Sequence, residues 1–207
     1  MHPNPVFRQA DRAEALADAR ARGFGTLMRN GDPVPMVAHV PFLLSGDGGT
    51  ADLHLTRSNP LGRTLDAPCP ALIAVAGPDG YVSPDWYGVA DQVPTWNYVA
   101  LHLVGRLEKR PEAELPGLLD RLSEHFESRL APKPLWRTTK LEPDSLARML
   151  RMIVPFRFHV EEIRSTYKLS QNKPDDARIA AARAMAASGF GQEVAALSTL
   201  MEEPPKS

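Results

Sequence analysis

The sequence predicts a mainly β fold with peripheral helices, in the α+β class. Short apolar or alternating segments recur in the first half of the chain, and hairpin-type turns separate them at residues 30–32 (Asn-Gly-Asp) and 46–49 (Gly-Asp-Gly-Gly). Amphipathic helical patterns follow from residue 115 onward. Because short antiparallel strands commonly remove their edges by closing on themselves, we expect a small barrel flanked by helices.

The expected strands share apolar or alternating composition and lie at residues 24–28, 34–44, 51–56, 71–76, 98–107 and 156–163. The second of these contains Pro35 and Pro41, which lack the amide hydrogen that a central strand needs. We therefore predict an edge strand that is bulged or bent, as at the corner of a small barrel. Residues 78–95 are expected to form a loop.

The expected helices begin with residues 10–22, which stop at Gly23, a residue typical of the position after a helix. Asn59 before Pro60 predicts a capped short helix over residues 61–65. Apolar residues at i, i+3, i+4 and i+7 predict a helix from residue 115 to 130. Further helices are expected at residues 144–152 and, as an Ala-rich pair hinged at 188–191, at residues 175–201.

Composition indicates an ordinary globular protein. The chain has 207 residues, 43% hydrophobic and 24% charged, which suits one compact core with at most a short appended element. With 24 basic and 25 acidic residues, the net charge of -1 provides no global attraction for nucleic acid. The single cysteine, Cys69, excludes an intrachain disulfide and a cysteine-based zinc site. No leader or membrane-spanning pattern is visible, so we expect a cytoplasmic protein.

The first candidate site is an anion site at residues 54–60. Arg57, the hydroxyl of Ser58 and the free amides of a helix start would place charge and donors around a phosphate, and Arg63 could add a second charge. The alternative interpretation is structural: Asn59 satisfies the helix amides and Arg57 is solvated.

The second candidate is the strand that carries Thr95, Trp96 and Asn97. On a strand, Thr95 and Asn97 share one face while the indole takes the other, and such a pair can bind the polar edge of a heterocycle such as isoalloxazine. The alternative is that the tryptophan only fills the core or an interface.

The third candidate is the polar run at residues 168–173. Gln171, Asn172 and Lys173 could reach a ligand of a partner subunit through amide and ammonium donors. The alternative is a solvated loop before the helix that follows Pro174.

Familiar catalytic and metal-binding patterns are missing from the sequence. The histidines have no metal-ligand spacing, and there is no Walker loop, nucleophile elbow or dinucleotide-binding glycine motif. Nothing nominates a metal site or a catalytic nucleophile, so the catalytic residues remain unknown.

Several motifs together carry a family resemblance over nearly the whole chain. They are Phe-Gly-Thr-Leu at residues 24–27, Ala-His-Val-Pro-Phe at 38–42, Tyr-Val-Ser-Pro-x-Trp-Tyr at 81–87, Val-Pro-Thr-Trp-Asn-Tyr at 93–98 and Lys-Leu-Ser-Gln-Asn-Lys at 168–173. In these motifs the chain resembles the PaiB family of FMN-binding negative transcriptional regulators. The family's fold is the split β-barrel shared with pyridoxamine phosphate oxidase-like flavoproteins.

The resemblance implies a homodimer with two non-covalent FMN sites between subunits. It implies that residues 1–173 form the FMN-binding split barrel with inserted helices and that residues 174–207 form a helical tail packed on the barrel or on the partner. The implied cofactor-binding residues lie along one strand, at the phosphate end and at the closing side of the pocket: His39, Val40, Pro41; Thr56, Arg57, Ser58, Asn59; and Thr95, Trp96, Asn97, Gln171, Asn172, Lys173.

The chain also departs from the family pattern. Thr56 and Ser58 stand where the resemblance leads us to expect alanines, and Ser165-Thr166 stands where we expect a glycine and a basic residue. The added hydroxyls change the set of groups available to a ligand.

Three functions follow as hypotheses. The resemblance implies a flavin-dependent repressor, although the tail offers few base-reading side chains and its second helix is followed by Glu202 and Glu203. The alternative is a flavin-dependent oxidoreductase using NADH or NADPH, in which the cofactor carries the chemistry. A haem-binding split barrel would need an axial histidine, for which His39, His54 and His102 are the candidates.

Overall fold

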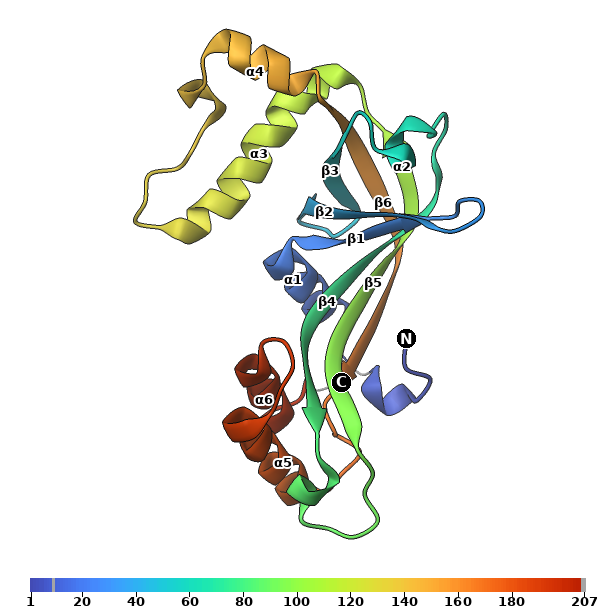
Figure 1. The fold of residues 1–207 in the computed structure, drawn as a ribbon, viewed down its shortest axis with the longest axis vertical. Helices are drawn as coiled ribbons and strands as arrows, with labels where there is room; N and C mark the ends of the chain where they lie inside the picture. Colours follow the sequence, from blue (N-terminus) through green and yellow to red (C-terminus); the bar gives the residue numbers. More distant parts are fainter. Residues whose placement is uncertain (9, 206–207) are drawn as a thin grey trace. The chain divides into compact units, whose positions relative to one another are not determined.

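The computed structural model describes residues 1–8 and 10–205 and combines strands with helices (Figure 1). The described strands close into a barrel in the order β1-β2-β3-β6-β5-β4, with β1–β2, β1–β4, β2–β3 and β3–β6 antiparallel. Their bounds are β1 Phe24–Arg29, β2 Met36–Leu44, β3 Thr50–Thr56, β4 Cys69–Val82, β5 Thr95–Lys109 and β6 Ile153–Lys168. The predicted class, a split β-barrel with peripheral helices, is confirmed.

The helices are α1 Arg12–Arg22, α2 Pro60–Arg63, α3 Leu115–Glu127, α4 Pro143–Leu150, α5 Asp175–Ser188 and α6 Val194–Glu202, with a 3-10 turn, η2, at Pro84–Tyr87. Each α-helix overlaps a helix expected from the sequence, whereas η2 lies within the segment expected to be a loop. Gly23 ends α1 with φ 58°, in the left-handed region that glycine adopts without strain.

The chain divides into two compact units. We call Ala19–Ala74 with Leu103–Glu162 the barrel unit, and Met1–Asp18, Val75–His102 and Ile163–Ser207 the tail unit. Strands β4, β5 and β6 each contribute residues to both units.

The barrel unit buries alternate side chains of its strands. Its fully buried large residues include Leu27, Phe42, Leu53, Ile73, Leu103, Phe156 and Phe158. Each such side chain stabilises the fold by about 1.5–3 kcal/mol relative to an exposed position. Strands β5 and β6 approach so closely at Gly105 that a β-carbon there would lie 1.8 Å from the backbone oxygen of His159, so only glycine fits.

The prediction that the second strand is an edge strand is wrong. Strand β2 pairs with β1 from Met36 to Pro41 and with β3 from Phe42 to Leu44, because barrel closure gives it neighbours on both sides. The predicted bend has a structural counterpart: Pro41 stands where the pairing changes from β1 to β3, so its missing amide hydrogen falls at the change of partner.

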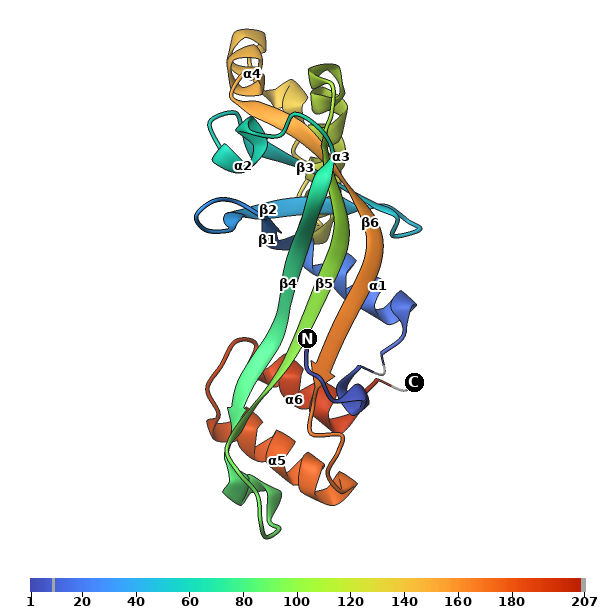
Figure 2. The ribbon, with the colours of Figure 1, turned by 90° about the vertical axis from the view of Figure 1, so that its right-hand side faces the viewer.

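In the tail unit, α5 and α6 lie side by side next to the end of β4 (Figures 1 and 2). Met185 and Leu197 approach Gly80 on β4, and the Ser198 hydroxyl donates to the Ala182 carbonyl oxygen at 2.9 Å. Residues 190–192 then extend along the strand, since the amide of Asp79 donates to Gln192 O and the amide of Tyr81 donates to Phe190 O. This pairing explains why β4 runs to Val82, through residues expected to be a loop.

Candidate functional site

The residues predicted to bind the cofactor fall into the two units. The barrel unit holds His39, Val40, Pro41, Thr56, Arg57, Ser58 and Asn59. The tail unit holds Thr95, Trp96, Asn97, Gln171, Asn172 and Lys173.

In the barrel unit, β2 presents a partly apolar outer face. His39 is exposed and Pro41 is half-buried on that face, whereas the side chain of Val40 points into the core. The ring of His39 lies 3.2 Å from the Thr26 hydroxyl on β1, measured from Nδ1 to Oγ1. The neighbouring Val37 is 52% exposed, and Phe24, which pairs with Pro41, is 50% exposed. We name the outward residues of these two strands, Phe24, Thr26, Met28, Val37, His39 and Pro41, the β1–β2 face.

Arg57 lies in the turn between β3 and α2, and three of its five N–H donors are already engaged. Its guanidinium donates to the carbonyl oxygens of Arg151 at 2.8 Å and Ile153 at 3.4 Å, and to the Glu112 carboxylate at 2.7 Å. The hydrogen bond from Arg57 lowers the pKa of Glu112 and the same bond raises the pKa of Arg57. An incoming phosphate would therefore compete with Glu112 for this side chain.

The expected free amides at the start of α2 are absent, and this expectation is wrong. Pro60 has no amide hydrogen, and the amide of Leu61 donates to Asn59 Oδ1 at 2.9 Å. The amides of Gly62 and Arg63 both donate to the Asn59 carbonyl oxygen. The single asparagine cap satisfies this short helix, so an anion here would depend on side chains alone.

Two exposed side chains beside Arg57 remain available. Within residues 1–8 and 10–205, neither the Ser58 hydroxyl nor the Arg63 guanidinium makes a hydrogen bond or an ion pair. Together with the anchored Arg57, they give the turn at residues 56–63 the charge and donors that a phosphate group requires. The donor set of this turn therefore fits a flavin phosphate, by side-chain contacts rather than helix amides.

In the tail unit, Asn97 is fully buried in a small polar network. Its Nδ2 donates to Ser170 Oγ at 2.8 Å, and the Ser170 oxygen lies 2.6 Å from the Tyr87 hydroxyl. Burial raises the pKa of Tyr87, and the hydrogen bond with Ser170 partly opposes this effect. Asn97 Oδ1 has no hydrogen-bond partner among the described residues.

A hollow with a volume of about 200 Å³ opens beside this network. We call it the lysine hollow; its lining residues are Phe7, Tyr87, Val93, Thr95, Asn97, Lys168, Ser170, Asn172 and Lys173. It brings together four predicted site residues: Thr95, Asn97, Asn172 and Lys173. Sequence reasoning did not select Lys168, Ser170, Tyr87 or Phe7, although the first three lie inside motifs that it had singled out.

The other two predicted residues of the tail unit have different surroundings. Gln171 accepts from the amide of Leu169 at 2.8 Å and donates to the Tyr167 carbonyl oxygen at 2.6 Å, so its amide closes its own turn. Trp96 is exposed and packs edge-on against Phe190, with ring centroids 5.6 Å apart. Neither lines the lysine hollow.

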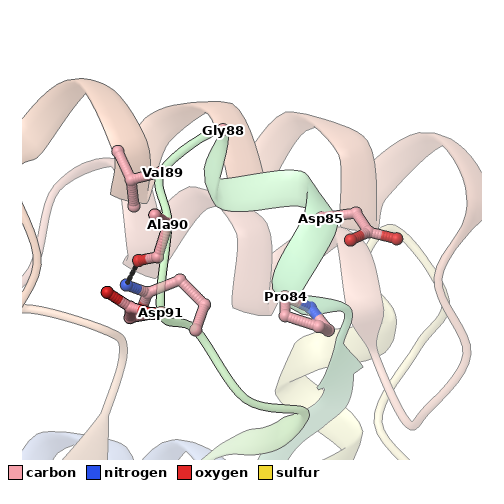
Figure 3. Close-up of a pocket in the computed structure, with 7 residues that line it drawn as sticks. Pro84, Asp85, Gly88, Val89, Ala90 and Asp91 are labelled. Atoms are coloured by element: carbon pink, nitrogen blue, oxygen red, sulfur yellow. Dashed lines mark hydrogen bonds between the residues drawn. The ribbon is translucent and has the colours of Figure 1, made fainter.

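Two other hollows are less suited to binding a charged ligand. One of about 290 Å³ in the barrel unit is mostly apolar and contains His54, whose Nδ1 has no partner among the described residues and whose pKa is lowered by burial. The other, of about 410 Å³, is an open fold of the loop from Pro84 to Gln92 (Figure 3). Figure 3 shows Asp85 and Asp91 at opposite sides of this loop, and no basic side chain lines it.

The described residues contain no group of three or more histidine, cysteine or carboxylate side chains that could hold a metal ion. The longest described helix, α5, has 14 residues. No helix in the described part of the chain combines the length and the apolar character that a bilayer span requires.

Comparison with known proteins gives one consistent result. The family described as "Putative FMN-binding domain" matches residues 1–162. The protease synthase and sporulation protein PAI 2 of Bacillus subtilis (strain 168) is 33% identical over 175 residues, covering 84% of this chain and 83% of that protein.

Two solved structures share the fold. The FAD and heme binding protein from Mycobacterium smegmatis superposes with a TM-score of 0.60 at 17% identity, covering 90% of this chain and 82% of that one. The flavocytochrome Anf3 from Azotobacter vinelandii superposes with a TM-score of 0.57 at 15% identity, covering 93% and 81%. Barrel, motifs and family match define a split β-barrel protein of the flavin-binding class.

Within that class, this chain belongs to the PaiB family. The family match supports a flavin as its cofactor.

Proposed function

We propose that the chain binds FMN non-covalently on the barrel unit, with the ring against the β1–β2 face and the phosphate at the turn of residues 56–63. The observation that carries this proposal is the anchoring of Arg57 by two backbone carbonyl oxygens, which holds one guanidinium at the surface of a turn whose Ser58 and Arg63 side chains have no partner among the described residues. A phosphate monoester matches this donor set. The flavin, when bound, supplies electron or hydride transfer chemistry.

The substitution Arg57→Ala tests the phosphate position. It removes a charge-assisted contact that only FMN can make, so FMN affinity should fall about tenfold or more while riboflavin affinity stays within about twofold. Quenching of flavin fluorescence measures both constants on the flavin-free chain. Equal losses for the two flavins would remove the phosphate from this turn.

We propose that the β1–β2 face also forms the contact between two copies of the chain. Phe24 and Val37 are each about half exposed there, and large exposed apolar groups on one face favour association. Val37→Glu should shift the mass measured by light scattering from dimer to monomer. Val34→Glu is the matched control, because Val34 is 66% exposed but precedes β2, and it should leave the dimer intact.

The biological output we propose is negative regulation of transcription, as in the family that the motifs resemble. The tail helices offer little basic surface, because α5 begins with Asp175 and Asp176, Arg178 is buried, and the exposed Arg183 lies 3.7 Å from a carboxylate oxygen of Glu202. We therefore expect any contact with DNA to use another surface. The alternative is an oxidoreductase using NADH or NADPH, in which the flavin carries the chemistry.

One pair of measurements separates these outputs. Salt-sensitive binding of duplex DNA by the FMN-loaded chain, without oxidation of NADH or NADPH, supports the regulator. Turnover of either nicotinamide at the flavin absorption band, without duplex binding, supports the oxidoreductase.

A further inference from the structure

The lysine hollow has an excess of positive charge. Lys168 donates to Thr95 Oγ1 and to the Trp96 carbonyl oxygen, and Lys173 donates to Gln92 Oε1. An ammonium group has three donors, so one remains on Lys168 and two remain on Lys173. No carboxylate occurs among the residues that line the hollow. Burial, and then the charge of Lys173, lower the pKa of Lys168, as expected for two cations without a counter-charge.

Asn97 also has a polar atom without a hydrogen-bond partner among the described residues. Its Nδ2 contacts Ser170 Oγ and Met201 Sδ, and its Oδ1 has no partner among the described residues. Reversing the amide would pair Oδ1 with Ser170 and leave the amino group there without an oxygen acceptor. In either orientation one end of a fully buried amide remains unsatisfied, which is costly unless a ligand supplies the missing partner.

The size of the hollow limits its occupant. A volume of about 200 Å³ lies below the roughly 300–1,000 Å³ typical of pockets for larger ligands. It suits an anion of a few non-hydrogen atoms rather than a tricyclic ring. Phe7, Tyr87 and Val93 provide apolar wall, which favours a small organic anion over a fully hydrated inorganic one.

We propose that the lysine hollow binds a small carboxylate that also carries a hydroxyl or amino hydrogen-bond donor. The carboxylate pairs with Lys168 and Lys173, and the donor satisfies the amide of Asn97, whose Oδ1 is buried in the free chain and turns toward the hollow as the ligand binds. This assigns Thr95, Asn97, Asn172 and Lys173 to a ligand other than the flavin ring. The proposal does not depend on the FMN site, because it concerns the tail unit alone.

Calorimetric titration of the full chain with glycolate and acetate, at constant ionic strength, tests the proposal. Glycolate should bind saturably at one site and about tenfold more tightly than acetate, because only glycolate has a hydroxyl for Asn97. Lys168→Met and Lys173→Met should each weaken glycolate about tenfold or more. Asn97→Ser should remove the preference for glycolate and keep the binding of acetate.

The control variant is Lys140→Met, an exposed lysine of the barrel unit that should leave both affinities unchanged. If Asn97→Ser does not fold, the glycolate-to-acetate ratio in the unmodified chain and the loss in Lys173→Met decide the question. Absence of saturable glycolate binding, or binding that survives both lysine substitutions, overturns the proposal. Displacement of glycolate by FMN but not by riboflavin also overturns it, because the hollow would then hold the flavin's own phosphate.

Discussion

The turn at residues 56–63 and the lysine hollow are both rich in cations, but they differ in whether a carboxylate already pairs with the positive charge. In the turn, Arg57 already binds two carbonyl oxygens and Glu112, and Asn59 satisfies the amides that begin α2. In the hollow, two ammonium groups face no carboxylate and a buried amide lacks a partner. Residue type nominates both sites for an anion, while a missing counter-charge and a buried unpaired group indicate that the hollow needs a ligand more than the exposed turn does.

The largest expected effect is the change with pH in the affinity of the lysine hollow for glycolate. A bound carboxylate stabilises protonated Lys168, whose pKa in the free chain is already lowered by burial and by Lys173. Glycolate affinity should therefore be constant below that lowered pKa and fall above it toward the affinity of Lys168→Met, because Lys173 still pairs with the carboxylate. Titrations between pH 7 and pH 10 measure the profile.

The matched control for this profile is Lys168→Arg. Its guanidinium stays charged throughout that range, so the decline should move to higher pH. An unchanged decline in that variant would show that another group titrates.

The second effect is on the folding stability of the turn at residues 56–63. Asn59→Ala removes the cap from the Leu61 amide and should lower the free energy of unfolding by about 0.5–2 kcal/mol, measured by urea denaturation. Ser58→Ala, which removes an adjacent hydroxyl without a partner in the described part of the chain, should change it by less than about 0.5 kcal/mol. Equal effects would mean that the cap does not hold the turn.

The third effect concerns the network behind the hollow. Tyr87→Phe removes the hydroxyl that lies 2.6 Å from Ser170 Oγ and should cost about 1 kcal/mol of folding stability. Tyr98→Phe is the comparison variant, because its hydroxyl makes no hydrogen bond within residues 1–8 and 10–205. A Tyr87→Phe chain as stable as the unmodified one would show that Ser170 is satisfied without Tyr87.

The smallest expected effect is on FMN affinity, when the carboxylate that pairs with Arg57 is removed. Glu112→Gln removes the carboxylate that competes for Arg57 and should raise FMN affinity about two- to fivefold, more at low salt. Glu124→Gln on α3 should leave the affinity unchanged. Flavin fluorescence titration measures both, and weaker FMN binding in Glu112→Gln would mean that Glu112 supports the site rather than opposing it.

Much of the fold could be predicted from local sequence signals. Gly23 predicted the end of α1, and Asn59-Pro60 predicted the start of α2. The i, i+3, i+4, i+7 spacing of apolar residues predicted α3. Each of these signals lies within the element that it predicts or next to it. The pairing of β2 on both sides and the extension of β4 could not be predicted. They depend on β1, β3 and residues 190–192, which are distant in sequence.

The candidate site was predictable by residue type more than by geometry. The alternation of Thr95 and Asn97 placed both on one face, and both line the hollow. The inward side chain of Val40, the pairing of Arg57 with Glu112 and the contribution of Lys168 depend on contacts between residues that are distant in sequence, which no local pattern contains.

Titration of the flavin-free chain with FMN, FAD and riboflavin measures whether the barrel unit recognises FMN through its phosphate. Quenching of flavin fluorescence should show saturable binding with FMN tightest, since a terminal phosphate dianion pairs with Arg57 better than the bridged phosphates of FAD. Riboflavin binding as tight as FMN, or a clear preference for FAD, would contradict the account.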